Sequence, residues 1–182
     1  ISLLEGFSGK GQLNTMYWSI LGDSYLSVED VAKADAAFSS GLVLTPRHYL
    51  LNLRRIGTLE TLKNYSKALA LTKSASNFNP DNERLQILRP YFEMRNKNID
   101  EAQEALASAQ KKQLKHYLLD FVAGKVSLNK KDYSQAVEHF STVYESKATS
   151  EYALQLARAL MFNGQQKEAE KTLESYISAN AK

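Results

Sequence analysis

Apolar and small residues recur along this chain at the spacing of amphipathic helices. The first such set, at i, i+3, i+4 and i+7, consists of Trp18, Leu21, Gly22 and Tyr25. A second stripe follows a short polar link and consists of Ala34, Phe38 and Gly41. Pro46 comes next and would end the second helix, because proline removes a backbone hydrogen bond. The pattern therefore predicts two helices joined by a short connection.

The same pattern returns at a fixed period. Four segments carry an apolar or aromatic residue, then two further residues, then alanine. The alanines follow one another at intervals of 34 residues and are Ala34, Ala68, Ala102 and Ala136. A fifth and weaker copy ends at Ala169, 33 residues later. The period predicts stacked helix pairs, since a single pair cannot bury both of its faces. Small residues such as Gly22, Gly124 and Ala157 would let the first helix of a pair approach the second closely.

The ordered set of Trp18, Leu21-Gly22, Tyr25, Ala34, Phe38 and Pro46 resembles the tetratricopeptide repeat family, with Gly41 where that family usually has alanine. The resemblance covers nearly all of the chain. It implies an all-α fold, a right-handed α-solenoid of about five helix pairs. The expected repeats are residues 15–48, 49–82, 83–116, 117–149 and 150–182. Residues 1–14 are expected to be the remnant of a preceding second helix, with the apolar residues Leu3, Leu4 and Phe7.

The inward faces of three first helices can be read in two ways. In the second repeat the alanine spacing places Asn52 and Arg55 where the family has large apolar residues, and Ile56 where it has a small one. A shift of one residue gives Leu53, Ile56 and Gly57, which match the family better. In the third repeat the competing face is Leu85, Leu88 and Phe92, and Pro90 occupies the place of a small residue. In the fourth repeat Leu119, Val122 and Val126 compete with Ala123 and Gly124.

Composition narrows the class of protein without naming a reaction. Hydrophobic residues make up 43% and charged residues 24%, which are values of a globular chain. A net charge of +3 is too small to indicate nucleic acid as a partner. There is no cysteine, and no run of apolar residues approaches the length of a membrane span, so no membrane insertion by this segment is expected. The three histidines, His48, His116 and His139, lack metal-ligand spacing.

No group of residues has the spacing of a catalytic site, so we expect neither enzymatic activity nor a cofactor or metal. The resemblance implies instead a protein–protein interaction scaffold, whose first helices line a concave groove for a polypeptide segment. The strongest groove candidates are Leu53, Arg84, Ile87, Tyr91, Leu118, Phe121, Lys125 and Arg158. The same face would include Met16, Ser19, Asp23, Leu50, Gly57, Leu154 and Met161. Under the alternative inward faces, several of these residues belong to the core instead.

A groove that is apolar with basic spots would suit an amphipathic segment with acidic residues. One subclass of the family holds a C-terminal carboxylate with Lys and Asn, but Ser19 and Asp23 stand at those places here, which argues against that mechanism. The segments 65–71 and 79–82 are similar to those of long bacterial envelope proteins linked to exopolysaccharide export and protein sorting. This similarity favours the periplasm or cell envelope over the cytoplasm. The alternative function is structural, with self-association or packing against further repeats.

Overall fold

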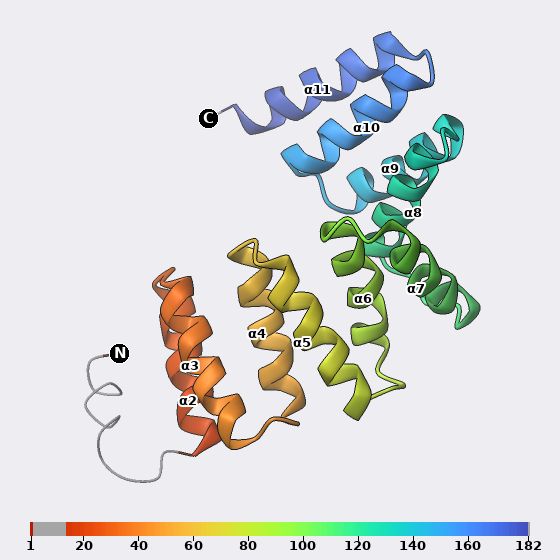
Figure 1. The fold of residues 1–182 in the computed structure, drawn as a ribbon. Coiled ribbons are helices and arrows are strands. Elements are labelled where there is room, and N and C mark those ends of the chain that lie inside the picture. Colours follow the sequence, from red (N-terminus) through yellow and green to blue (C-terminus); the bar gives the residue numbers. More distant parts are fainter. Residues whose placement is uncertain (2–13, 182) are drawn as a thin grey trace. The chain divides into compact units, whose positions relative to one another are not determined.

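The computed structural model describes residue 1 and residues 14–181, and this part of the chain contains ten α-helices and no strand. Each helix has 13 to 15 residues, and consecutive helices run in opposite directions (Figure 1). Their bounds are α2 Thr15–Ser27, α3 Val31–Leu44, α4 Tyr49–Thr61, α5 Tyr65–Phe78, α6 Glu83–Arg95, α7 Ile99–Lys111, α8 Tyr117–Asn129, α9 Tyr133–Ser146, α10 Ser150–Phe162 and α11 Gln166–Asn180. The all-α fold class is confirmed. The expected helix remnant in residues 1–14 falls almost entirely on residues 2–13, which lie outside the described part.

The chain divides into two compact units, residues 1–85 and residues 86–182, with the boundary inside α6. Unit 1 is built mainly from α2 to α5, and each of these helices packs against the next. Unit 2 is built from the rest of α6 and from α7 to α11, and from α7 onward successive helices again pack together.

The periodic alanines are buried, as predicted. Ala34, Ala68, Ala102 and Ala136 have no exposed surface, and Ala169 is 3% exposed. A side chain of one methyl group lets the second helix of each pair approach its neighbours closely. The repeat seen in the sequence is therefore a repeat of close helix contacts.

Two glycines on first helices each face an aromatic ring that leaves no room for a Cβ atom. A Cβ atom at Gly22 would overlap the Phe38 ring, and one at Gly124 would lie 2.9 Å from Cε1 of Phe140. Both rings are fully buried, so neither has room to move away. The predicted role of Gly22 and Gly124 in close pairing is confirmed.

In the second repeat, the structure follows the alanine spacing. Asn52 and Ile56 are buried at 3% and 1% exposure, Arg55 and Leu53 are half-buried, and Gly57 is exposed. The shifted face is therefore wrong for Leu53 and Gly57, while Ile56, which both faces share, is buried. Burial of the Asn52 amide is compensated, because it donates to the carbonyl oxygens of Pro46 at 2.9 Å and His48 at 3.1 Å.

In the third and fourth repeats, both candidate faces are partly correct. Leu85 and Phe92 of α6 are fully buried and Leu88 is half-buried, but Pro90 is buried as well. Helix α8 buries both of its competing sets, because it packs against both α7 and α9. A helix that is enclosed in this way has no single inward face to predict.

The turn inside each helix pair has a common design. Its left-handed residues are Glu29, Lys63, Lys97, Lys131 and Gly164, and each is followed by the N-cap of the second helix. The cap residues are Asp30, Asn64, Asn98, Asp132 and Gln165. The backbone N–H of each cap residue donates to the carbonyl five residues before it, at 2.8–3.0 Å. This bond closes the end of the first helix while the cap residue begins the second.

Gly164 is the glycine member of this set, with φ at +81°. We expect Gly164→Ala to lower the free energy of unfolding by about 1–2 kcal/mol, because a Cβ atom is disfavoured in the left-handed region. Lys131→Ala is the matched control, since Lys131 already has a Cβ atom at a φ of +62°. Urea denaturation of the two variants measures the difference. Equal losses would contradict the argument from backbone conformation.

Candidate functional site

The eight groove candidates fall into three groups by exposure. Arg84 and Arg158 are exposed, and Leu53, Ile87 and Lys125 are half-buried. The remaining three lie in the core, at 1–6% exposure, and are Tyr91, Leu118 and Phe121. The sequence allowed these three residues to lie either in the groove or in the core, and the structure places them in the core.

Unit 1 contains a groove of about 380 Å³ that is formed by first helices. It is lined by Leu26 from α2, by Arg84 from the start of α6 and, from α4, by Leu50, Leu53, Arg54, Gly57, Thr58 and Thr61. Four of these residues were expected on the groove face, namely Leu50, Leu53, Gly57 and Arg84. The α4 members that the sequence did not indicate continue the helical spacing from Leu50 through residues 54, 58 and 61.

The two threonines turn their polar atoms toward their own helix. Thr58 Oγ1 donates to the Arg54 carbonyl at 2.9 Å, and Thr61 Oγ1 donates to the Gly57 carbonyl at 3.1 Å. Threonine hydroxyls commonly bond in this way one turn back along a helix. Because both hydroxyl protons are already used, neither threonine offers the groove a free hydroxyl donor.

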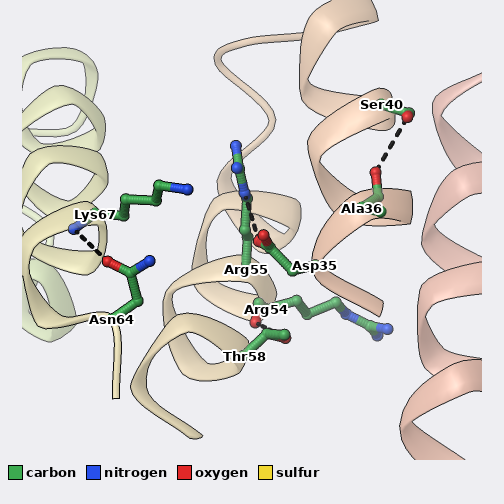
Figure 2. Close-up of polar contacts among 8 residues, drawn as sticks. All are labelled: Asp35, Ala36, Ser40, Arg54, Arg55, Thr58, Asn64 and Lys67. Carbon is green, nitrogen blue, oxygen red and sulfur yellow. Dashed lines mark hydrogen bonds and ion pairs between the residues drawn. The ribbon is translucent and has the colours of Figure 1, made fainter. Parts of the chain in front are cut away.

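Adjacent arginines on α4 have different partners. Arg55 Nε donates to Asp35 Oδ1 of α3 at 2.9 Å, and both side chains are about four-fifths buried (Figure 2). Arg54 extends in another direction and pairs with Asp23 of α2, where both side chains are about two-fifths exposed. An exposed ion pair contributes little stability. Arg55 therefore joins the two helices, whereas Arg54 remains accessible at the groove.

Gly57 lies in the middle of α4 with no packing reason for a glycine. A Cβ atom there would meet no other atom within 4 Å, in contrast to Gly22 and Gly124. Glycine inside a helix costs about 0.5–1 kcal/mol relative to alanine. What the glycine provides is an uncovered stretch of main chain at the groove.

Unit 2 contains a group of three cations, which we call the cation cluster: Arg95 on α6, Lys125 on α8 and Arg158 on α10. The Arg95 guanidinium donates to both carboxylate oxygens of Glu151, at 2.5 and 2.8 Å. Lys125 Nζ donates to Gln155 Oε1 at 2.6 Å. Both acceptors lie on α10, so this helix supplies the partners of two cations and contributes the third.

Buried aromatic rings support the cation cluster from the interior. The Arg95 guanidinium lies 5.0 Å from the ring centres of Tyr91 and Phe121, and Lys125 Nζ lies 5.6 Å from that of Phe121. Burial lowers the pKa of Lys125, and the charges of Arg158 and Arg95 lower it further, while Glu151 opposes them. The rings of Tyr91 and Phe121 are thus buried themselves and lie against the cations of the cluster.

Two histidines have structural roles that the sequence did not indicate. His48 and His116 are the N-caps of α4 and α8, and their Nδ1 atoms accept backbone N–H bonds from Leu51 and Leu118, each at 3.2 Å. His139 Nδ1 lies 3.3 Å from Asp120 Oδ1. Among the residues with described positions, no group of three or more His, Asp or Glu side chains could hold a metal ion. No helix in the described ranges combines the length and the apolar character needed to cross a membrane.

Comparison with known proteins agrees with this fold. Residues 93–151 match the sequence model of the tetratricopeptide repeat. A tetratricopeptide repeat protein from Parabacteroides merdae ATCC 43184 is similar in structure with a TM-score of 0.76 and 14% identity, over 97% of this chain and 71% of that one. The APC/C hetero-tetramer Cut9–Hcn1 gives a TM-score of 0.78 and 18% identity, over 99% of this chain but only 36% of that one.

PilW, a widely conserved type IV pilus biogenesis factor, gives a TM-score of 0.70 at 20% identity, over 90% of this chain and 76% of that chain. No curated protein sequence matches. Residues 93–151 thus belong to the tetratricopeptide repeat family, and the helix pairs of the chain have the fold of that family.

Proposed function

We propose that this chain is a scaffold that binds a polypeptide segment in the groove of unit 1. Tetratricopeptide repeats are generally non-catalytic modules of protein–protein interaction. The observation that carries the proposal is Gly57: a destabilising glycine, unexplained by packing, opens the main chain of α4 at a groove formed by three first helices. A ligand backbone or side chain can approach there more closely than any other residue type would allow.

The lining of the groove suggests the chemistry of the ligand. Its apolar part comes from Leu26, Leu50 and Leu53, and its charged lining residues are Arg84 and Arg54, of which Arg54 pairs with Asp23. Complementary charge would favour a segment that alternates apolar and acidic side chains. The similarity to envelope proteins and the fold shared with the pilus factor PilW support a bacterial envelope location as part of this proposal.

Filling the space above Gly57 tests the proposal. Peptides are first selected from a displayed library on the intact chain, and their dissociation constants are then measured by calorimetry. We expect Gly57→Leu to weaken binding at least about tenfold, which corresponds to about 1.4 kcal/mol. The fold should be retained, because a side chain at residue 57 begins in open space.

Ala70→Leu is the matched control, because it adds alkyl bulk at an exposed position of α5 and should leave affinity unchanged. Gly57→Ala adds a single methyl group and should have an intermediate effect. If Gly57→Leu binds the selected peptides as tightly as the original chain, the groove is not their site. If the library yields no peptide, polypeptide binding by this chain is refuted.

A further inference from the structure

We infer that the cation cluster of unit 2 is a binding site for an acidic side chain of the partner, and that Glu151 occupies the place of that side chain until the partner arrives. The inference rests on the proposed function for one point only, namely that the partner is a polypeptide. It concerns a different surface from the groove of unit 1, so the two can be tested separately.

The first argument is the balance of charge. The charges that act on Lys125 are those of two cations, Arg95 and Arg158, and of one carboxylate, Glu151. Lys125 itself bonds to the neutral amide of Gln155, and the Arg158 guanidinium lies 5.5 Å from the ring centre of Phe162 on α10. Lys125 is half-buried, where charges interact more strongly than in bulk water. An additional carboxylate would therefore be attracted to this group of residues.

The second argument is the direction from which Glu151 binds. The Arg95 side chain is 17% exposed, whereas the Glu151 side chain is 42% exposed, so the carboxylate covers the guanidinium from the solvent side. A carboxylate from a partner would approach from the same side. It could form the same pair of N–H···O bonds, because the planar guanidinium binds carboxylates in a two-bond geometry.

The third argument is that Arg95 is held in place independently of Glu151. Its guanidinium lies against two rings that are fully buried, those of Tyr91 and Phe121. Contacts of this kind attract a cation to the ring face and restrict its orientation. Arg95 would thus remain oriented for a new acceptor when Glu151 leaves, and a preorganised site loses less entropy on binding.

The surroundings indicate what flanks the acidic side chain. Leu154 and Met161 are more than half exposed and lie one turn before and after Arg158 on the same face of α10. The ligand that fits is an acidic residue with apolar neighbours. A partner segment with glutamate or aspartate between apolar residues would match both the cations and these two side chains.

The test uses a synthetic peptide of alternating glutamate pairs and leucines, acetylated and amidated so that it has no terminal charge. A matched peptide has glutamine in place of glutamate. Calorimetry on the intact chain should show binding of the glutamate peptide that weakens with salt and is lost with the glutamine peptide. Because Glu151→Gln removes the competing carboxylate, it should tighten binding about five- to tenfold, while Lys125→Met and Arg158→Gln should weaken it by a similar factor.

Melting curves confirm that each variant is folded. If Glu151→Gln fails to fold, Lys125→Met and Arg158→Gln still decide whether the cations bind the peptide. Unchanged affinity in a folded Glu151→Gln variant would overturn the inference, as would equal binding of the glutamine peptide or absence of binding to every variant. Binding that requires a free C-terminal carboxylate would overturn it too, because the site would then recognise a chain end. The glutamate peptide also has the chemistry proposed for the ligand of the unit 1 groove. The effects of Glu151→Gln, Lys125→Met and Arg158→Gln therefore identify the cation cluster as its site, whereas the effect of Gly57→Leu tests the proposed function.

Discussion

Phe121→Ala is expected to lower the free energy of unfolding of unit 2 by about 3–5 kcal/mol, the usual cost of removing a buried ring. Phe121 is 1% exposed, and its ring centre lies 5.6–6.2 Å from those of Tyr91, Phe140 and Tyr152. Truncation would leave a cavity among three rings. It would also remove a surface against which Arg95 and Lys125 are held.

Thermal and urea denaturation followed by circular dichroism measure this loss. Leu154→Ala is the control, since Leu154 is 56% exposed on α10 and its truncation should change stability by about 0.5 kcal/mol or less. A Phe121→Ala variant as stable as the control would place Phe121 on the surface. It would restore the sequence-based hypothesis that this ring contacts a ligand directly.

Gly22→Ala and Gly57→Ala should change stability in opposite directions, although both add one methyl group to a first helix. At residue 22 the new Cβ atom would collide with the fully buried Phe38 ring, and overpacking of this kind costs about 1–3 kcal/mol. At residue 57 the Cβ atom meets nothing, so the better helix propensity of alanine should add about 0.5–1 kcal/mol.

Urea denaturation of the two variants, analysed with a common slope, gives the signs directly. Destabilisation by Gly57→Ala would mean that α4 needs its glycine for the fold. That result would remove the reason to regard Gly57 as part of a binding surface. Stabilisation by Gly22→Ala would contradict the close approach of α2 and α3.

The repeat architecture could be predicted from sequence because its contacts are local and alike. Each alanine of the 34-residue series lies at a position where only a small side chain fits between helices. The series therefore shows directly where neighbouring helices come close to each other. The burial of Phe121 on α8 could not be predicted in this way. Helix α8 is apolar on most of its surface, and such a helix gives no sequence signal that separates groove from core.

Contacts between residues that are far apart in the sequence could not be predicted either. Arg95 and Glu151 are 56 residues apart, and no local spacing relates them. Gly57 was among the residues of the expected groove face, but its significance depends on a comparison with Gly22 and Gly124 that needs coordinates. The caps at His48 and His116 depend on backbone geometry at helix starts, where Ser, Thr, Asp and Asn are the usual signals.

The Arg95–Glu151 ion pair has a consequence for the order in which unit 2 folds. Packing between consecutive helices involves short loops, and proteins rich in such contacts fold rapidly. Closing a loop of 56 residues costs more chain entropy than joining neighbouring helices, so this pair should form after α7, α8 and α9 are in place. Refolding kinetics of unit 2 should therefore be nearly unchanged by Glu151→Gln, and its effect should fall on the rate of unfolding.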